Sequence, residues 1–340
     1  MESLFIDRKD TTMDVQSSRL IIRIQGQPRP TSFPLNQLKF IVVSSYINLS
    51  SRVLLAFDKA GITLVLINPR QNGSWLICNG NRHGHVERRL LQYKAQLDEV
   101  HRVEMAKQLV SYKILTQYRA LLRHGRRRKD LRYTIKTALS QLRERKRSLQ
   151  SVYSLESIRG IEGAAASAYF NALTQIAPTE FGFKKRQRRP PKDPINALLS
   201  LTYTLAHSEA VRAIIGYGFD PTLGFLHDIS YGRESLACDV MEVLRADIDS
   251  WVMKLLLEGY LKKSHFQYPD EERCILNKEG RAIFYPLYQS QSYRWRKRCR
   301  HLVKLGLHLS KLKINAPLDA INNDEHITQD HTDETEIIDF

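Results

Sequence analysis

Residues 86–123, VERRLLQYKAQLDEVHRVEMAKQLVSYKILTQYRALLR, repeat apolar side chains at spacings of three and four residues. This is the period of an α-helix with one buried face, so the segment predicts one long helix or a once-broken pair. Helix-forming composition continues to about Leu312, and glycine and proline clusters at 189–194 and 216–224 divide it into separate helices. The larger part of the chain is therefore predicted to be helical.

The chain before residue 86 has a different pattern. Short apolar runs are separated by Gly, Pro, Asn and Ser, which is typical of strands: RLIIRI, FIVVSSYINLS, ITLVLI and SWLIC. One helix is expected among them, with Ser50 or Ser51 as its N-cap and Gly61 as its terminator. We therefore predict an α+β fold, with a small N-terminal β-rich domain over residues 1–85 and a larger all-α domain over residues 86–316.

Positive charge is concentrated in the first 318 residues. The 340-residue chain has 52 Lys and Arg against 36 Asp and Glu, which gives a formal charge of +16. Eight acidic residues and no Lys or Arg lie in 319–340, so the preceding part carries 52 minus 28, or +24. Such an excess predicts a polyanionic partner, with nucleic acid first and an anionic membrane surface second. Residues 317–340 are polar, acidic and without periodicity, and we expect them to be a disordered tail.

The cysteines and the N-terminus exclude two other classes of protein. Cys78, Cys238, Cys274 and Cys299 have no spacing typical of zinc ligands, which argues against a zinc module. The N-terminal sequence MESLFIDRKD does not resemble a secretory signal, and no apolar stretch of 18 residues follows. We therefore expect a cytoplasmic protein that does not enter a membrane.

Three basic clusters, at 123–132, 184–189 and 294–300, strengthen the prediction of nucleic-acid binding. Each one alone is more typical of a solvated face, but three in a strongly basic chain favour contact with phosphates. The middle cluster precedes Asp193 and Pro194, which predict a helix N-cap and first helical position. The predicted DNA contacts are Lys184, Lys185, Arg186, Arg188, Arg189, Arg245, Arg294 and Arg296.

Carboxylates on an apolar helix suggest a metal site. Asp239 and Glu242 are three residues apart in LACDVMEVLR, so they share one face of a helix turn. Burying both carboxylates is costly unless a cation compensates, and Arg245 offers an ordinary salt bridge as the alternative to a metal. Glu162 and His227 are further candidates, although a solvated glutamate and a buried structural histidine are the ordinary interpretations of each alone.

Three motifs occur in order along the chain: RGIEGAAASAYF at 159–170, RRPPKDPINALLS at 188–200 and GFLHDISYGRESLACDVMEVLR at 224–245. PLNQLKFIVV, LSSRVLLAF and GITLVLI precede them in the N-terminal part. Together these stretches resemble the CRISPR-associated adaptation integrases, the Cas-one family, over nearly the whole chain to about residue 312.

The resemblance implies an enzyme whose catalytic residues lie in the helical domain. Glu162, His227 and Glu242 would hold Mg²⁺ or Mn²⁺, with Asp239 as the neighbouring carboxylate. Some family members have Asp where Glu242 stands, which leaves open which of Asp239 and Glu242 is the direct ligand. Arg233 matches a basic position of the motif and would hold the scissile phosphate, while His227 can instead act as a proton shuttle.

The implied reaction is insertion of short foreign DNA into a CRISPR array, by attack of its 3′-hydroxyls on the ends of the repeat. The implied partners are double-stranded DNA, a second copy of the chain and a Cas-two dimer, and a reverse transcriptase is a further candidate. A metal-dependent nuclease or resolvase of branched DNA has the same site residues and remains an alternative. So does a non-catalytic DNA-binding assembly subunit, whose ligand set we would expect to be broken.

Overall fold

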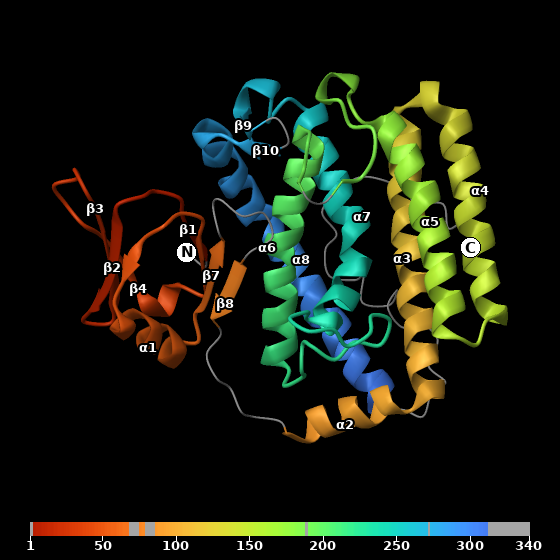
Figure 1. The fold of residues 1–340 in the computed structure, drawn as a ribbon, viewed down its shortest axis with the longest axis horizontal. Coiled ribbons are helices and arrows are strands. Elements are labelled where there is room, and N and C mark those ends of the chain that lie inside the picture. Colours follow the sequence, from red (N-terminus) through yellow and green to blue (C-terminus); the bar gives the residue numbers. More distant parts are fainter. Residues whose placement is uncertain (1–2, 68–74, 79–85, 188–189, 271–272, 312–340) are drawn as a thin grey trace, which may run out of the picture.

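The computed structural model describes residues 3–67, 75–78, 86–187, 190–270 and 273–311. A β-rich N-terminal part lies beside a larger, mostly helical part (Figure 1). The predicted α+β class is therefore confirmed. The predicted boundary at 85/86 and the predicted tail at 317–340 both involve residues outside the described ranges.

The strands of the N-terminal part form two four-stranded sheets within the described residues. The first has the order β1 (Ser3–Ile6), β5 (Phe40–Val43), β7 (Thr63–Ile67) and β8 (Trp75–Cys78). The second has the order β4 (Thr31–Pro34), β3 (Arg19–Ile24), β2 (Thr11–Gln16) and β6 (Asn48–Leu49). In the first sheet β1, β5 and β7 are parallel and β8 is antiparallel. The four predicted strand runs all contain strands, whereas β1, β2 and β4 were not predicted.

The continuous apolar run of β5 is explained by burial on both faces of its sheet. Ile41 and Val43 pack into the core of the β part. Phe40 and Val42 point the other way and belong to the core of the helical part. Alternate residues of one strand thus serve two cores, as expected for a parallel strand covered on both sides.

Helix α1 (Ser51–Ala60) ends as the sequence predicts, at Gly61 with a φ of 65°. This left-handed conformation is one that glycine adopts without strain. Ser50 occupies the N-cap position, but its side chain does not cap the helix. Its hydroxyl instead donates to Oδ1 of Asp14 at 3.0 Å, which ties α1 to β2.

Long helices build the rest of the molecule. They are α2 (Val86–Leu97), α3 (Glu99–Arg127), α4 (Arg132–Ser148), α5 (Leu155–Ile176), α6 (Pro194–Gly216), α7 (Ser235–Leu257) and α8 (Lys278–Lys311). The helical segment that begins at residue 86 is broken once, at Asp98, whose side chain accepts a hydrogen bond from the backbone N–H of His101 at 3.1 Å. Asp193 caps α6 and Pro194 is its first residue, as predicted.

The helical part is not entirely helical, which corrects the predicted all-α architecture. Strands β9 (Phe266–Asp270) and β10 (Arg273–Leu276) pair as an antiparallel hairpin between α7 and α8. Short 3₁₀ turns cover Leu35–Gln37, Lys129–Leu131, Leu149–Ser151, Thr179–Phe181 and Lys263–His265. Among the helices of the described residues, none is long and apolar enough to cross a membrane.

Helix α8 connects the two parts of the molecule. The side chain of Arg296 donates to the hydroxyl of Ser3 at 3.1 Å, and Gln289 donates to the carbonyl of the same serine at 3.2 Å. The ring of Tyr285 stacks on Phe5 with centroids 4.8 Å apart. These contacts attach the edge strand β1 to the helical part.

Candidate metal centre and its supporting loop

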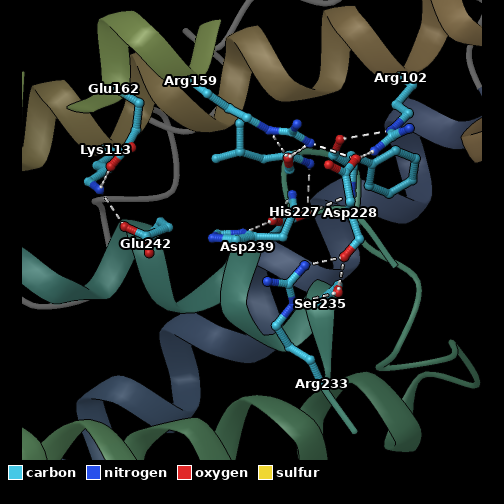
Figure 2. A network of polar contacts seen from close by, with 12 residues as sticks. Arg102, Lys113, Arg159, Glu162, His227, Asp228, Arg233, Ser235, Asp239 and Glu242 are labelled. Carbon is cyan, nitrogen blue, oxygen red and sulfur yellow. Dashed lines mark hydrogen bonds and ion pairs between the residues drawn. The ribbon is translucent and has the colours of Figure 1, made fainter. Parts of the chain in front are cut away.

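Three helices and one loop bring the predicted catalytic residues together (Figure 2). Helix α3 packs against both α5 and α7. Glu162 comes from α5, and Asp239 and Glu242 come from α7. His227 lies in the loop between α6 and α7. The site is therefore assembled by helix packing from distant parts of the sequence.

Lys113 of α3 joins two of the predicted ligands. Its ammonium donates to Oε1 of Glu162 and to Oε2 of Glu242. Lys113 and Glu242 are each 5% exposed. A buried ammonium group requires compensating negative charge, and the two carboxylates supply it. The structure thus brings Glu162 and Glu242 to one shared cation.

Arg245 holds the second oxygen of Glu242. Its Nε donates to Oε1 at 2.8 Å, and its guanidinium lies 4.7 Å from the ring centroid of Tyr203. Burial by itself would raise the pKa of Glu242, but Arg245 and then Lys113 hold that pKa well below its usual range. Glu242 is therefore ionised. The internal salt bridge that the sequence offered as an alternative is present, and it is part of the same cluster.

Asp239 holds the loop that carries His227. Its Oδ1 lies 2.6 Å from Nδ1 of His227 and accepts the backbone N–H of the same residue at 3.1 Å. Its Oδ2 accepts the N–H groups of Phe225 at 2.6 Å and Leu226 at 3.1 Å. Asp239 is fully buried, with 0% exposure. Both of its oxygens are therefore used to position the loop.

A glycine allows this loop to approach α7. A Cβ atom on Gly224 would lie 2.8 Å from Oδ2 of Asp239 and 2.9 Å from the backbone oxygen of Ser235. Both distances are too short for a carbon atom at that position. Gly224 is thus required for the close contact that places His227 beside the carboxylates.

Two arginines, from α3 and α5, also hold the loop that carries His227. Arg159 of α5 donates to the carbonyl of Leu226 at 2.7 Å, and Arg102 of α3 donates to that of Phe225 at 3.1 Å. Both guanidinium groups also pair with Asp228, at 2.7 and 2.6 Å. Arg159 first, and then Arg102, lower the pKa of Asp228 to about 2. The loop is therefore held by side chains from three helices.

Arg233 lies at the far end of the same loop. Its guanidinium donates to the carbonyl of Asp228, and its Nε donates to the hydroxyl of Ser235 at 3.3 Å. That hydroxyl donates to the same carbonyl at 2.7 Å. In this arrangement Arg233 closes the loop on itself and is half-buried.

The donor set suits a hard divalent cation. Glu162 and Glu242 already share one cation, and the His227 imidazole lies close enough to help lower the pKa of Glu242. Since Nδ1 of His227 is engaged by Asp239, Nε2 is the nitrogen that can face a metal. Within the described residues, no three His, Cys, Asp or Glu side chains already surround a common point as ligands. The chemistry of these residues fits Mg²⁺ or Mn²⁺. The ammonium of Lys113 lies where such an ion would be held.

Six of the eight predicted DNA-binding residues divide into three groups. Lys184, Lys185 and Arg294 are exposed. Arg186 is half-buried, and it donates to the side chain of Asn196 at 2.8 Å. Arg188 and Arg189 lie outside the described residues.

Two of the predicted contacts are corrected by the structure. Arg296 is 7% exposed and pairs with the buried Glu209 at 3.5 Å. Only 19% of the Arg245 side chain is exposed, and its guanidinium is directed toward Glu242. Both side chains are used inside the fold, so we withdraw them from the predicted DNA surface.

Comparison with known proteins identifies the family. The model of the family described as CRISPR associated protein Cas1 matches residues 4–290. The chain belongs to the Cas1 family. The protein named CRISPR-associated endonuclease Cas1 1 from Thermodesulfovibrio yellowstonii is 37% identical over 302 residues, which cover 87% of this chain and 94% of that relative. The resemblance seen in the sequence motifs is therefore confirmed.

Solved structures show the same fold at low sequence identity. A Cas1 protein from Thermotoga maritima superposes with a TM-score of 0.79 at 23% identity, covering 93% of this chain and 99% of that one. A casposase bound to an integration product gives 0.78 at 22% identity, covering 92% of both chains. A chain of a Cas6-RT-Cas1–Cas2 complex gives 0.77 at 21% identity, with 91% of this chain and 35% of that chain covered. The Cas1 fold is thus shared along nearly the whole chain.

Three charged residues of this Cas1 site were missed in the sequence. They are Lys113, Arg102 and Arg159, which hold the carboxylates and the His227 loop. Arg159 opens the motif RGIEG, one helical turn before Glu162, so its position on the same face was a usable signal. Lys113 and Arg102 lie in α3, within the helical stretch 86–123 but far from the three motifs at 159–170, 188–200 and 224–245.

Proposed function

We propose that this Cas1 chain is a metal-dependent DNA integrase of CRISPR adaptation. It joins the 3′-hydroxyl of a short foreign DNA to a phosphodiester at the edge of a CRISPR repeat by transesterification. The observation that carries the proposal is the convergence of Glu162 and Glu242 on one cation position beside His227. Membership of the Cas1 family supplies the reaction class.

In this proposal Glu162, Glu242 and Nε2 of His227 hold one Mg²⁺ or Mn²⁺. An ion held there would supply a Lewis acid for the scissile phosphate and positive charge for the transition state. Asp239 is a positioning residue, because its oxygens are committed to the His227 ring and to the backbone of the loop. These contacts support Glu242, rather than Asp239, as the direct ligand in this proposal.

The surroundings of the site support DNA as the substrate. Arg233 donates to the carbonyl of Asp228, the residue after His227, and in this proposal it exchanges that contact for an oxygen of the scissile phosphate. The exposed Lys184, Lys185 and Arg294 provide phosphate contacts farther away. With a DNA substrate of this kind, the location that we propose is the cytoplasm.

The partners follow from the same family. We propose that the chain works as a homodimer on a Cas2 dimer, which separates two catalytic sites. One of its structural neighbours is part of a complex of Cas1 with Cas2, Cas6 and RT, where RT denotes a reverse transcriptase. A reverse transcriptase is therefore a candidate partner here as well.

A plain endonuclease is the second candidate, and the names of the curated relatives favour it. It would use the same ligands with water in place of the 3′-hydroxyl. The two reactions differ in their products, because only the integrase joins strands. The non-catalytic assembly subunit is disfavoured, since Glu162, His227 and Glu242 are all present.

The test incubates the purified chain and its Cas2 partner with a labelled short duplex, a supercoiled repeat plasmid and Mn²⁺ or Mg²⁺. Label joined to the plasmid is expected with a free 3′-hydroxyl, and none with a 3′-dideoxy end or with EDTA. Glu162→Ala, His227→Ala and Glu242→Ala should abolish joining and leave DNA binding largely intact. Glu156→Ala, an exposed glutamate on the same helix as Glu162, is the matched control and should join normally. Cleavage without joining would establish the endonuclease instead.

A further inference from the structure

The cluster around Lys113 is electrically balanced without a metal. Glu162 and Glu242 bring two negative charges, and Lys113 and Arg245 bring two positive charges. Every oxygen of Glu242 has a cationic partner, because Oε1 accepts from Arg245 and Oε2 from Lys113. A buried ion cluster of this kind is stable only while its charges stay matched.

A divalent cation between the same carboxylates upsets this balance. The lysine ammonium and the metal seek the same oxygens, Oε1 of Glu162 and Oε2 of Glu242. With both present, a site that is only 5% exposed at Glu242 would hold two excess positive charges within contact distance. Arg245 has a second anchor on the Tyr203 ring, whereas the ammonium of Lys113 is held by the two carboxylates. Lys113 is thus the cation that has to move.

We propose that Lys113 is a placeholder cation. In the metal-free protein its ammonium holds Glu162 and Glu242 together, and a divalent cation displaces it from between them on binding. This inference deepens the proposed function and rests on its metal site. Lys113 acts here as a positioning residue, because it keeps the two ligands assembled before the metal arrives.

The proposal predicts that removing Lys113 raises the affinity for metal, whereas removing a merely structural lysine would lower it. If Lys113 only supported the fold, its removal would loosen the two ligands and weaken metal binding. If it is a placeholder, its removal takes away the competitor and leaves Oε1 of Glu162 and Oε2 of Glu242 without their cationic partner. Metal binding is then strengthened, while the metal-free protein is destabilised.

The experiment measures Mn²⁺ binding to the full chain without DNA, by the electron paramagnetic resonance signal of free Mn²⁺, together with thermal unfolding in EDTA and in Mn²⁺. Lys113→Met keeps an unbranched side chain of similar length and removes the charge. Its Mn²⁺ affinity should rise at least about tenfold, because a like charge in contact with the ion is removed. Its unfolding temperature should be below wild type in EDTA and recover in Mn²⁺.

Two variants control this result. Lys113→Arg keeps the cation and should bind Mn²⁺ about as weakly as wild type. Lys107→Met removes the same charge from the same helix, where the ammonium lies 4.5 Å from the Tyr153 ring centroid, and should leave Mn²⁺ affinity unchanged. If Lys113→Met does not fold in either condition, Lys113→Gln, a neutral donor, is titrated with the same expectation.

Equal or weaker Mn²⁺ binding by the neutral variants than by wild type would overturn the proposal. Absence of Mn²⁺ binding by every variant, wild type included, would overturn both the placeholder and the metal-dependent function. Strengthened Mn²⁺ binding in a protein that never joins DNA strands would support the placeholder and contradict only the integrase.

Discussion

The ring nitrogen Nδ1 of His227 lies 2.6 Å from Oδ1 of Asp239, a carboxylate that also accepts three backbone N–H groups from the same loop. One buried side chain therefore sets both the course of the loop and the orientation of the imidazole. This relationship gives different roles to two acidic residues that are three positions apart on α7. Asp239 supports His227, and Glu242 faces the shared cation.

Asp239→Asn is expected to disconnect the loop from α7. An amide has one accepting oxygen, and its NH₂ group would oppose the donors that Asp239 now receives. We expect a loss of about 1–3 kcal/mol in the free energy of unfolding, together with loss of strand joining. Urea unfolding measures the free energy of unfolding. The ¹⁵N spectra of His227 report the loss of the contact between its ring and Asp239. Glu258→Gln, an exposed carboxylate at the end of the same helix, should behave as wild type in both.

Gly224→Ala tests the close approach of the loop. The added Cβ would meet Asp239 and the backbone of Ser235 at 2.8 Å, and backbone atoms cannot move away cheaply. We expect about 1–3 kcal/mol of destabilisation in urea unfolding and a large loss of strand joining. Gly216→Ala, in α6 with no atom within 4 Å of its Cβ position, is the control and should gain up to about 1 kcal/mol. A normal joining rate in Gly224→Ala would contradict this account of the loop.

The sequence predicted much of the fold because its strongest patterns are local. The helical period from residue 86, the cap at Asp193 and the terminator at Gly61 depend on neighbouring residues and were found. The hairpin of β9 and β10 was missed because its sequence, FQYPDEERCIL, contains a proline and four consecutive charged residues. Such a composition is more typical of a loop.

The candidate site was only partly predictable. The proposed metal ligands stand in motifs. Lys113 instead follows the buried Val110 by three residues, on a helix face that the apolar period assigns to the core. A lone charge at such a position signals a buried ion pair, yet its partners on α5 and α7 depend on helix packing. The buried position of Arg296 could have been predicted more easily. It shares a helix face with the buried Ser292, Cys299 and Val303, and that spacing predicts an inward side chain.

The exposed lysines before α6 are expected to contact DNA phosphates. Lys184→Gln with Lys185→Gln should weaken binding of any duplex sequence and reduce the slope of log K against log salt by about 1–2. Fluorescence anisotropy over a series of salt concentrations measures that slope. Neutralising Lys9 and Lys59, two exposed lysines of the β part, changes the net charge equally and should leave the slope unchanged. Equal slopes in all three proteins would remove Lys184 and Lys185 from the DNA path.

The last prediction concerns Asp249, which is fully buried on α7. Burial raises its pKa to about 6, although the Tyr203 hydroxyl, which donates to Oδ1, opposes the rise. Between about pH 4 and 6 the folded protein therefore holds a proton that the unfolded chain releases. The stabilisation is complete below pH 4 and is lost as the pH rises through 6, and its full extent is about 3 kcal/mol.

Urea unfolding at pH 4.5, 6 and 8 measures this loss against a variant without the titrating group. Asp249→Asn keeps an oxygen for the Tyr203 hydroxyl but cannot ionise, so the fall in stability from pH 4.5 to 8 should become smaller. Tyr203→Phe removes the hydrogen bond that lowers the pKa of Asp249, so the fall should move to higher pH. A wild-type fall that persists unchanged in Asp249→Asn would mean that another group titrates in this range.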